Sequence, residues 1–238
     1  MVPVMIQSWN RLTFINWRYD ARYLQSHLPA GLRVDQHDGF GWVSLTPFDL
    51  QRFRLPFLPP LPWLSHFPET NLRTYVIGPE GPGIWFFSLD AARLHAVVGA
   101  SSLYRLPYHW ARMRIERRGT TIRYTSERKR GEGHVSAELE LGPEVVRKTA
   151  LQKFLVERYR LYALRNGKLA TAQIDHKPWP LREARLMGLE ESLRRLVNID
   201  DMGLPALVNY SKGVTAKIGM LRECGSPSGD ADTFNTAA

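Results

Sequence analysis

Apolar and aromatic residues are dense, and often alternate with polar ones, in several short segments of this chain, which predicts β-strands. The first two strands are expected over residues 9–18 and Phe40–Leu45, with the turn signal Asp38-Gly39 between them. Residues 71–77 and 84–89 flank a turn rich in glycine and proline, and this pair predicts a hairpin. A second hairpin is expected over residues 122–127 and 134–141, and further strands over residues 169–175 and 214–221.

Three other segments have apolar residues at helical spacing. Asp20 is a candidate N-cap for a short helix over Ala21–Leu28, and amphipathic helices are expected over residues 149–164 and 181–196. Residues 47–68 are rich in proline and aromatic residues, which predicts a stiff apolar loop. That loop either covers a cavity or packs over one end of a sheet, and the sequence leaves both open.

The order of these elements indicates the fold class. Strands and helices do not alternate regularly, so we expect an antiparallel β or α+β fold. With 238 residues the chain is within the range of one domain, which we place over residues 1–224. Residues 225–238 are small and polar, and we expect them to form a disordered tail.

Charge and composition disfavour several classes of function. The formal net charge is +9, but the basic residues form no long tract, so nucleic-acid binding is not favoured. No run reaches the ~18 apolar residues of a membrane span, and the N-terminus lacks the features of a signal peptide. We therefore expect a cytoplasmic protein with no membrane association. We also expect exposed loops with aromatic residues, which are compatible with a homodimer.

Metal and cofactor sites are not expected either. Cys224 is the single cysteine, which excludes a disulfide framework and a cysteine-based metal site. The seven histidines do not pair at the short spacings of zinc sites. The chain has neither GxGxxG nor a phosphate-binding loop, so we expect no cofactor.

Residues with catalytic potential are concentrated in two apolar segments. The first contains Glu69, Asn71 and Arg73, where an unpaired charge would be costly to bury. A hydrophobic cavity would raise the pKa of Glu69 and make it a general acid or base, with Asn71 and Arg73 as substrate-binding residues. The alternative is a structural pair between Glu69 and an arginine that joins a loop to the sheet.

Tyr108 and His109 form the second group of candidates. Histidine titrates near neutral pH and tyrosine can donate a hydrogen bond to a developing oxyanion, so both are candidate catalytic residues. Pro107 also suits the first turn of a helix that runs to Met113, in which the two side chains would only pack or cap. Both interpretations stay open.

Several separate motifs resemble one bacterial family. They are Leu28-Pro29-Ala30-Gly31-Leu32, Glu69-Thr70-Asn71-Leu72-Arg73-Thr74-Tyr75-Val76, Trp85-Phe86-Phe87-Ser88-Leu89-Asp90-Ala91, Leu106-Pro107-Tyr108, Arg158-Tyr159-Arg160-Leu161-Tyr162 and His176-Lys177-Pro178-Trp179-Pro180. Over roughly residues 8–222 the chain resembles the YqjF-like proteins (DUF2071), which fall in the acetoacetate-decarboxylase-like superfamily. The resemblance implies an α+β fold with a large antiparallel, barrel-like β-sheet, flanking helices and a small-molecule cavity.

The resemblance to acetoacetate decarboxylase itself also suggests roles for particular residues. Asn10-Arg11 is similar to an Asn-Arg pair of that enzyme, which implies that Arg11 binds a substrate carboxylate and that Glu69 lines the same cavity. Leu106-Pro107-Tyr108-His109 is similar to its Pro-Lys-Lys segment, but tyrosine and histidine replace the lysines. Neither side chain can form an imine, so any reaction is expected to proceed without a Schiff base.

These observations lead to two hypotheses about function. In the first, the protein binds, and in one version transforms, a small organic acid or oxo-acid through Arg11, Glu69 and Tyr108 or His109. In the second, it is a non-catalytic module that responds to a ligand or binds a partner on the same fold.

Overall fold

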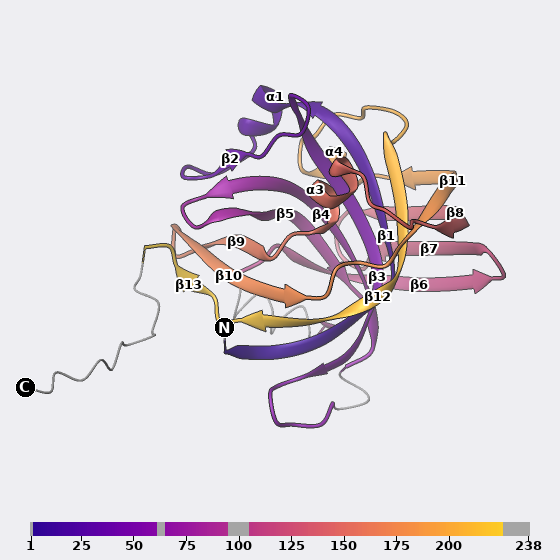
Figure 1. Cartoon of the computed structure of the whole chain (residues 1–238), viewed down its shortest axis with the longest axis horizontal. Helices are drawn as coiled ribbons and strands as arrows, with labels where there is room; N and C mark the ends of the chain where they lie inside the picture. Colours follow the sequence, from indigo (N-terminus) through magenta and orange to yellow (C-terminus); the bar gives the residue numbers. More distant parts are fainter. Residues whose placement is uncertain (1, 61–64, 95–104, 226–238) are drawn as a thin grey trace, which may run out of the picture.

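The computed structural model describes residues 2–60, 65–94 and 105–225, which form one large β-sheet with few helices (Figure 1). The described strands are β1 Pro3–Asp20, β2 Arg33–Val34, β3 Phe40–Arg54, β4 Phe67–Gly78, β5 Gly81–Ala91, β6 Tyr108–Arg118, β7 Thr121–Arg128, β8 His134–Glu144, β9 Arg160–Arg165, β10 Lys168–His176, β11 Leu181–Glu191, β12 Leu207–Gly219 and β13 Arg222–Glu223. The described helices are short: α1 Ala21–Gln25, α3 Ala150–Val156 and α4 Leu193–Leu196. Among these residues no helix has the length and apolar character needed to cross a membrane.

The sheet closes on itself as a barrel. The order of pairing around the ring is β5, β4, β3, β1, β12, β10 and β9, and β9 pairs again with β5. The pairs β5–β9 and β5–β6 are parallel and the other pairs are antiparallel, so the barrel is mixed. Strands β6, β7, β8 and β11 form a second layer that leaves the ring at β5 and rejoins it at β12. The expected barrel-like sheet is thus confirmed, with two parallel pairs in addition.

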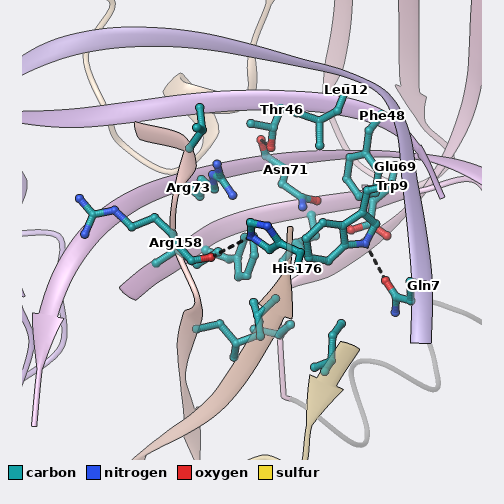
Figure 2. Close-up of a pocket in the computed structure, with 18 of the residues that line it drawn as sticks. Gln7, Trp9, Leu12, Thr46, Phe48, Glu69, Asn71, Arg73, Arg158 and His176 are labelled. Carbon is teal, nitrogen blue, oxygen red and sulfur yellow. Dashed lines mark hydrogen bonds between the residues drawn. The ribbon is translucent and has the colours of Figure 1, made fainter. Parts of the chain in front are cut away.

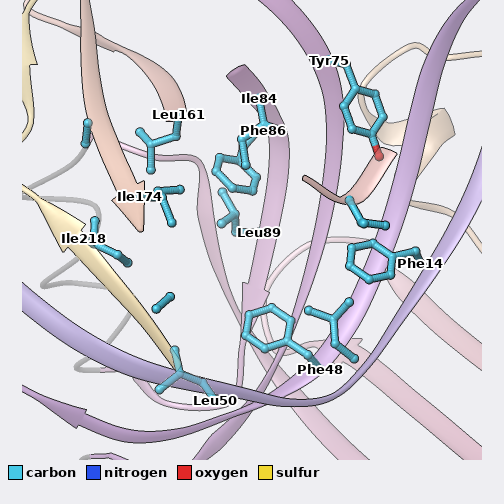
Figure 3. Packing of buried hydrophobic residues seen from close by; sticks show 14 of the residues in the cluster. Phe14, Phe48, Leu50, Tyr75, Ile84, Phe86, Leu89, Leu161, Ile174 and Ile218 are labelled. Carbon is cyan, nitrogen blue, oxygen red and sulfur yellow. The ribbon is translucent and has the colours of Figure 1, made fainter. Parts of the chain in front are cut away.

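Apolar side chains line the inside of the ring. Every ring strand contributes to this cluster, and Figure 3 shows Phe14 and Phe48 facing Ile84, Leu161 and Ile218 across the interior. Burying each such side chain contributes roughly 1.5–3 kcal/mol. A second apolar cluster lies between β1, β3 and β4 of the ring and the layer of β7, β8 and β11. The strands β1, β3 and β4 therefore have two buried faces, which explains why consecutive residues of each strand are buried.

The hairpins β4–β5 and β7–β8 lie where the sequence predicts them. The expected helix over residues 181–196 is wrong: Leu181–Glu191 is strand β11, and α4 covers Leu193–Leu196. The register of β11 with β8 shifts between Leu186 and Gly188, so one extra residue separates Leu186 from Leu189. This bulge converts a spacing of two into a spacing of three, which imitates a helix in the sequence.

Two other expected helices are shorter or absent. The helix over residues 149–164 ends at Val156, and Arg160–Arg165 is strand β9. The expected helix after Pro107 is instead strand β6, in which residues 108–110 pair with β5 and residues 111–118 pair with β7. Burial alternates from Ala111 to Glu116, with Arg112 and Arg114 on the exposed face, as expected for a strand.

The proline-rich segment contains more strand than expected. Strand β3 continues to Arg54 and includes Pro47, which lacks a backbone N–H. Its pairing with β1 is interrupted between Asn10 and Ile15, next to Pro47, so no ladder bond to β1 is needed there. Residues 61–64 of the expected loop lie outside the described residues, as does the expected tail beyond Gly225.

Candidate functional site

A cavity of about 100 Å³ lies inside the barrel ring (Figure 2). Its walls are mostly apolar, and the polar or charged side chains that line it are Gln7, Thr46, Glu69, Asn71, Arg73, Tyr108, Arg158 and His176. By the measure that one buried water needs roughly 10–15 Å³, the cavity holds about seven to ten waters, or an organic acid of a few carbons. An apolar cavity with a few convergent polar groups is the usual form of a small-molecule site.

Strand β4 supplies three adjacent polar groups of the cavity. Side chains two residues apart point to the same face of a strand, so Glu69, Asn71 and Arg73 all face the interior. Leu72 faces the second apolar cluster instead. The alternation in the sequence therefore places a carboxyl, an amide and a guanidinium in one row.

Glu69 is the titratable group most strongly affected by burial. Glu69 is only 4% exposed, and its removal from water raises the pKa of the carboxyl to about 8. Hydrogen bonds from Tyr108 and Asn71 oppose this rise because they stabilise the ionised form, and Asp90 adds to it by repulsion. At neutral pH the carboxyl is mainly protonated and can donate a proton.

Tyr108 lies against Glu69. Its hydroxyl donates to Oε1 of Glu69 at 3.2 Å. Burial away from water is the main cause that raises the pKa of Tyr108 well above its ordinary value, and the nearby carboxyl of Glu69 adds to it. The parallel pairing of Leu89 with Tyr108 brings the start of β6 beside β5 and so places this phenol in the cavity. Tyr108 can therefore donate a hydrogen bond to a ligand oxygen but does not act as a base near neutral pH.

Arg73 is the cavity cation without a matching anion. Its guanidinium lies 5.5 Å from the ring centre of Phe14 and 5.8 Å from that of Tyr75. Nε of Arg73 is buried and has no hydrogen-bond partner among the described residues, and none of their carboxylates lies within ion-pair distance of its guanidinium. Burial lowers the pKa of Arg73, since a buried charge without compensation is unfavourable.

Arg158 and His176 also line the cavity, and the chemistry of the sequence did not single them out as site residues. The Arg158 guanidinium points away from His176 in Figure 2 and forms an ion pair with Asp35 at 2.6 Å. The His176 ring lies 2.8 Å from the carbonyl oxygen of Lys177 and 3.4 Å from that of Arg158. Both side chains are held by the protein itself and form the wall. Their only signal in the sequence was membership of the quoted motifs.

The structure does not bring Arg11 into the cavity. Its guanidinium pairs with the buried Asp49 at 2.7 Å and is not among the groups that line the interior. Arg11 has a φ of +48°, and it lies in the interruption of the β1–β3 pairing. Trp9 and Leu12 line the cavity on either side of it. The irregular backbone shifts the alternation of β1, so the expectation that Arg11 and Glu69 share one interior does not hold.

His109 also lies away from the cavity. It follows Tyr108 in strand β6 and so points to the opposite face, where it is level with Asp90. Partial burial and the charge of Arg128 lower the pKa of His109. On that face Arg128 and Asp90 form a buried ion pair at 2.9 Å, and Ser88 accepts a hydrogen bond from Arg128 at 2.5 Å. This group joins β5 to β7 across β6 and supports the strand that carries Tyr108.

The cavity walls contain no lysine among the described residues. The described part of the chain also has no group of three or more His, Cys, Asp or Glu side chains that could hold a metal ion. The available chemistry therefore consists of one carboxyl of raised pKa, one phenol, one amide and one guanidinium that has no carboxylate partner among the described residues.

The fold of the chain is similar to that of acetoacetate-decarboxylase-like barrels. It matches the crystal structure of acetoacetate decarboxylase from Legionella pneumophila subsp. pneumophila str. Philadelphia 1 with a TM-score of 0.66 and 13% identity, over 93% of this chain and 87% of that one. An acetoacetate decarboxylase-like enzyme from Sphingomonas wittichii RW1 gives a TM-score of 0.62 and 14% identity, over 94% of each chain. The enduracididine biosynthesis enzyme MppR, complexed with pyruvate, gives a TM-score of 0.59 and 11% identity, over 94% of this chain and 91% of that one. At these identities the likeness concerns the fold.

The sequence places the chain in a narrower group. Residues 6–215 match the family DUF2071, described as "Uncharacterized conserved protein". The chain is also 38% identical over 215 residues to the "Uncharacterized protein YqjF" of Bacillus subtilis (strain 168), and the match covers 88% of each protein. The protein belongs to the DUF2071, or YqjF-like, family.

Proposed function

We propose that this protein binds a small organic acid or oxo-acid in its barrel cavity and exchanges protons with it without forming a Schiff base. Arg73 holds the carboxylate, Glu69 donates and accepts the proton, and Tyr108 donates a hydrogen bond to a ligand oxygen. The observation that carries the proposal is the Arg73 guanidinium, which lines the cavity and has no ion-pair partner in the part of the chain that the structure describes. A charge-assisted hydrogen bond to a carboxylate would satisfy it.

The protonated state of Glu69 supports the same assignment. If Glu69 were ionised, its carboxylate would neutralise the charge of Arg73 and repel the carboxylate of an acidic ligand. Because the pKa of Glu69 is raised to about 8, the cavity keeps a positive charge at neutral pH. A pKa near the working pH is also the condition under which a general acid or base is most effective.

Binding can be tested by calorimetry with butyrate and 2-oxobutyrate. Arg73→Gln should weaken the binding of both acids by roughly tenfold or more, because it removes a charge-assisted hydrogen bond. The matched control is Arg11→Gln, which removes a guanidinium outside the cavity and should leave affinity unchanged. Equal losses in the two variants, or no binding of either acid by the unmodified protein, would contradict the proposal.

Catalysis is tested separately by proton exchange. In D₂O, a general base beside the ligand should speed the exchange of the C3 protons of 2-oxobutyrate for deuterium, as followed by ¹H NMR. Glu69→Gln should abolish this acceleration and keep binding. If the unmodified protein binds the acid and produces no exchange, the non-catalytic, ligand-responsive module becomes the better description.

The outer face of the sheet supports a small ligand over nucleic acid. Exposed arginines of the β7 and β11 strands pair with glutamates of β8, as in Arg123–Glu138 at 2.5 Å and Arg185–Glu140 at 2.6 Å. Paired charges of this kind reduce the attraction to phosphate groups. A cytoplasmic location and a homodimer stay predictions.

A further inference from the structure

Two side-chain atoms of the polar cavity residues on β4 have no hydrogen-bond partner within the described ranges, and one is a donor while the other is an acceptor. Nε of Arg73 is a donor and Oδ1 of Asn71 is an acceptor, and both atoms are buried. Buried polar atoms are nearly always paired, so a ligand that displaces water from the cavity has to offer each of these atoms a complementary group. The guanidinium requires an acceptor from the ligand, and the amide oxygen requires a donor.

The orientation of the Asn71 amide follows from its neighbour. A hydrogen bond from Asn71 lowers the pKa of Glu69, which means that the amide nitrogen donates to the carboxyl. The amide oxygen must then point away from Glu69. Thr46 cannot satisfy it, because the Thr46 hydroxyl donates to the backbone oxygen of Asn71 at 3.3 Å. Asn71 is 8% exposed, so a ligand that fills the cavity leaves this oxygen no access to water.

The spacing of residues along strand β4 sets the distance between the side chains of Asn71 and Arg73. Residues two apart on one face of a strand are separated by roughly 6.6–6.8 Å. Hydrogen bonds from both side chains can reach one molecule in which the acceptor and the donor are a few bonds apart. A carboxylate and a hydroxyl on a chain of about four carbons meet this condition and fit a cavity of about 100 Å³.

The donor of the ligand is better supplied by a hydroxyl than by an ammonium group. An amino acid would place its positive charge beside the unpaired guanidinium of Arg73, where like charges repel. A hydroxyl carries no charge and can also accept a hydrogen bond from Tyr108 or from protonated Glu69. A simple oxo group, in contrast, is an acceptor and would leave the Asn71 oxygen unpaired.

From this arrangement we infer that the cavity prefers hydroxy acids to oxo acids of the same length, with Asn71 as the residue that selects the hydroxyl. The inference rests on the proposed function, because Arg73 must hold the carboxylate. An oxo acid still binds through that carboxylate, but with lower affinity, since a buried acceptor without a partner is unfavourable.

The test compares three four-carbon acids by calorimetry at about pH 6, where Glu69 is protonated. In the unmodified protein, 2- or 3-hydroxybutyrate should bind roughly tenfold or more tightly than 2-oxobutyrate, with butyrate similar to the oxo acid. Asn71→Leu, of similar volume, should reduce the preference for the hydroxy acid over both butyrate and the oxo acid to less than about twofold.

Each outcome has a distinct meaning. If no acid binds, the proposed function and this inference both fail. If acids bind through Arg73 but the oxo acid binds as tightly as the hydroxy acids, the inference is overturned and the proposed function stands. The comparison of acids in the unmodified protein decides this even when the Asn71 variant does not fold. A hydroxyl preference that persists in a folded Asn71→Leu protein would remove Asn71 from the selecting role.

Discussion

Replacing Glu69 with glutamine should change how the stability of the protein depends on pH. The pKa of the carboxyl is about 8 in the folded protein and 4.5 in the unfolded chain. Below the unfolded pKa both states are protonated, and the neutral, buried carboxyl is tolerated. As pH rises above 4.5 the unfolded chain ionises first, so the free energy of unfolding falls until the folded carboxyl also ionises near pH 8.

The size of the effect follows from the shift. At about 1.36 kcal/mol per unit, a shift from 4.5 to about 8 corresponds to roughly 5 kcal/mol of stability lost across this window. Glutamine has the same shape, accepts the Tyr108 hydrogen bond and does not titrate. The free energy of unfolding of Glu69→Gln, minus that of the unmodified protein, should therefore rise by several kcal/mol from about pH 5 to about pH 9.

Urea unfolding followed by tryptophan fluorescence at several pH values measures this difference directly. Subtraction removes the contributions of Asp90, His109 and other groups that titrate in both proteins. Parallel pH profiles would refute the reasoning, because they would mean that Glu69 is ionised in the folded state. That result would favour the alternative of a structural ion pair between Glu69 and an arginine.

Three other predictions concern the barrel and its chemistry. Arg128→Met should destabilise the protein by about 3–5 kcal/mol in urea unfolding because Asp90 stays buried without its partner, whereas Arg123→Met, which breaks an exposed pair, should cost about 0–1 kcal/mol. Gly213→Ala should lower the melting temperature measured by circular dichroism, because φ is +133° and an added Cβ would lie 2.3 Å from the carbonyl oxygen of Trp9; an unchanged melting temperature would contradict this close packing. Borohydride reduction in the presence of 2-oxobutyrate should leave the intact mass unchanged, because no lysine is among the described residues of the cavity wall, and a covalent adduct would count against chemistry without a Schiff base.

Part of the candidate site could be predicted from sequence because strands have a period of two. Glu69, Asn71 and Arg73 occupy alternate positions in an apolar strand, and the structure places all three in the cavity. Tyr108, expected as a hydrogen-bond donor, joins them through the start of β6. Within one regular strand, the alternation of residues in the sequence was sufficient to predict which side chains face the cavity.

The sequence was misleading where the backbone departs from regular pairing. Arg11 lies in a bulge next to Pro47, so its side chain does not follow the alternation of β1, and the equivalence with a carboxylate-binding arginine is lost. The bulge near Leu186 gave a strand the spacing of a helix. Irregular positions depend on which strand lies alongside, and this is a property of the closed barrel that no short stretch of sequence contains.

Closure of the barrel also has a consequence for biosynthesis. Strand β1 pairs with β12, and 191 residues separate Asn16 from its partner Leu207. At translation rates of roughly 5–20 residues per second, the first strand waits about 10–40 s on the ribosome before its partner emerges. During that interval one long side of β1 offers unpaired backbone groups to other nascent chains. Chains truncated before residue 207 should accordingly aggregate or be degraded, and chaperones that shield strand edges should matter more for the yield of this protein than for helical proteins of equal length.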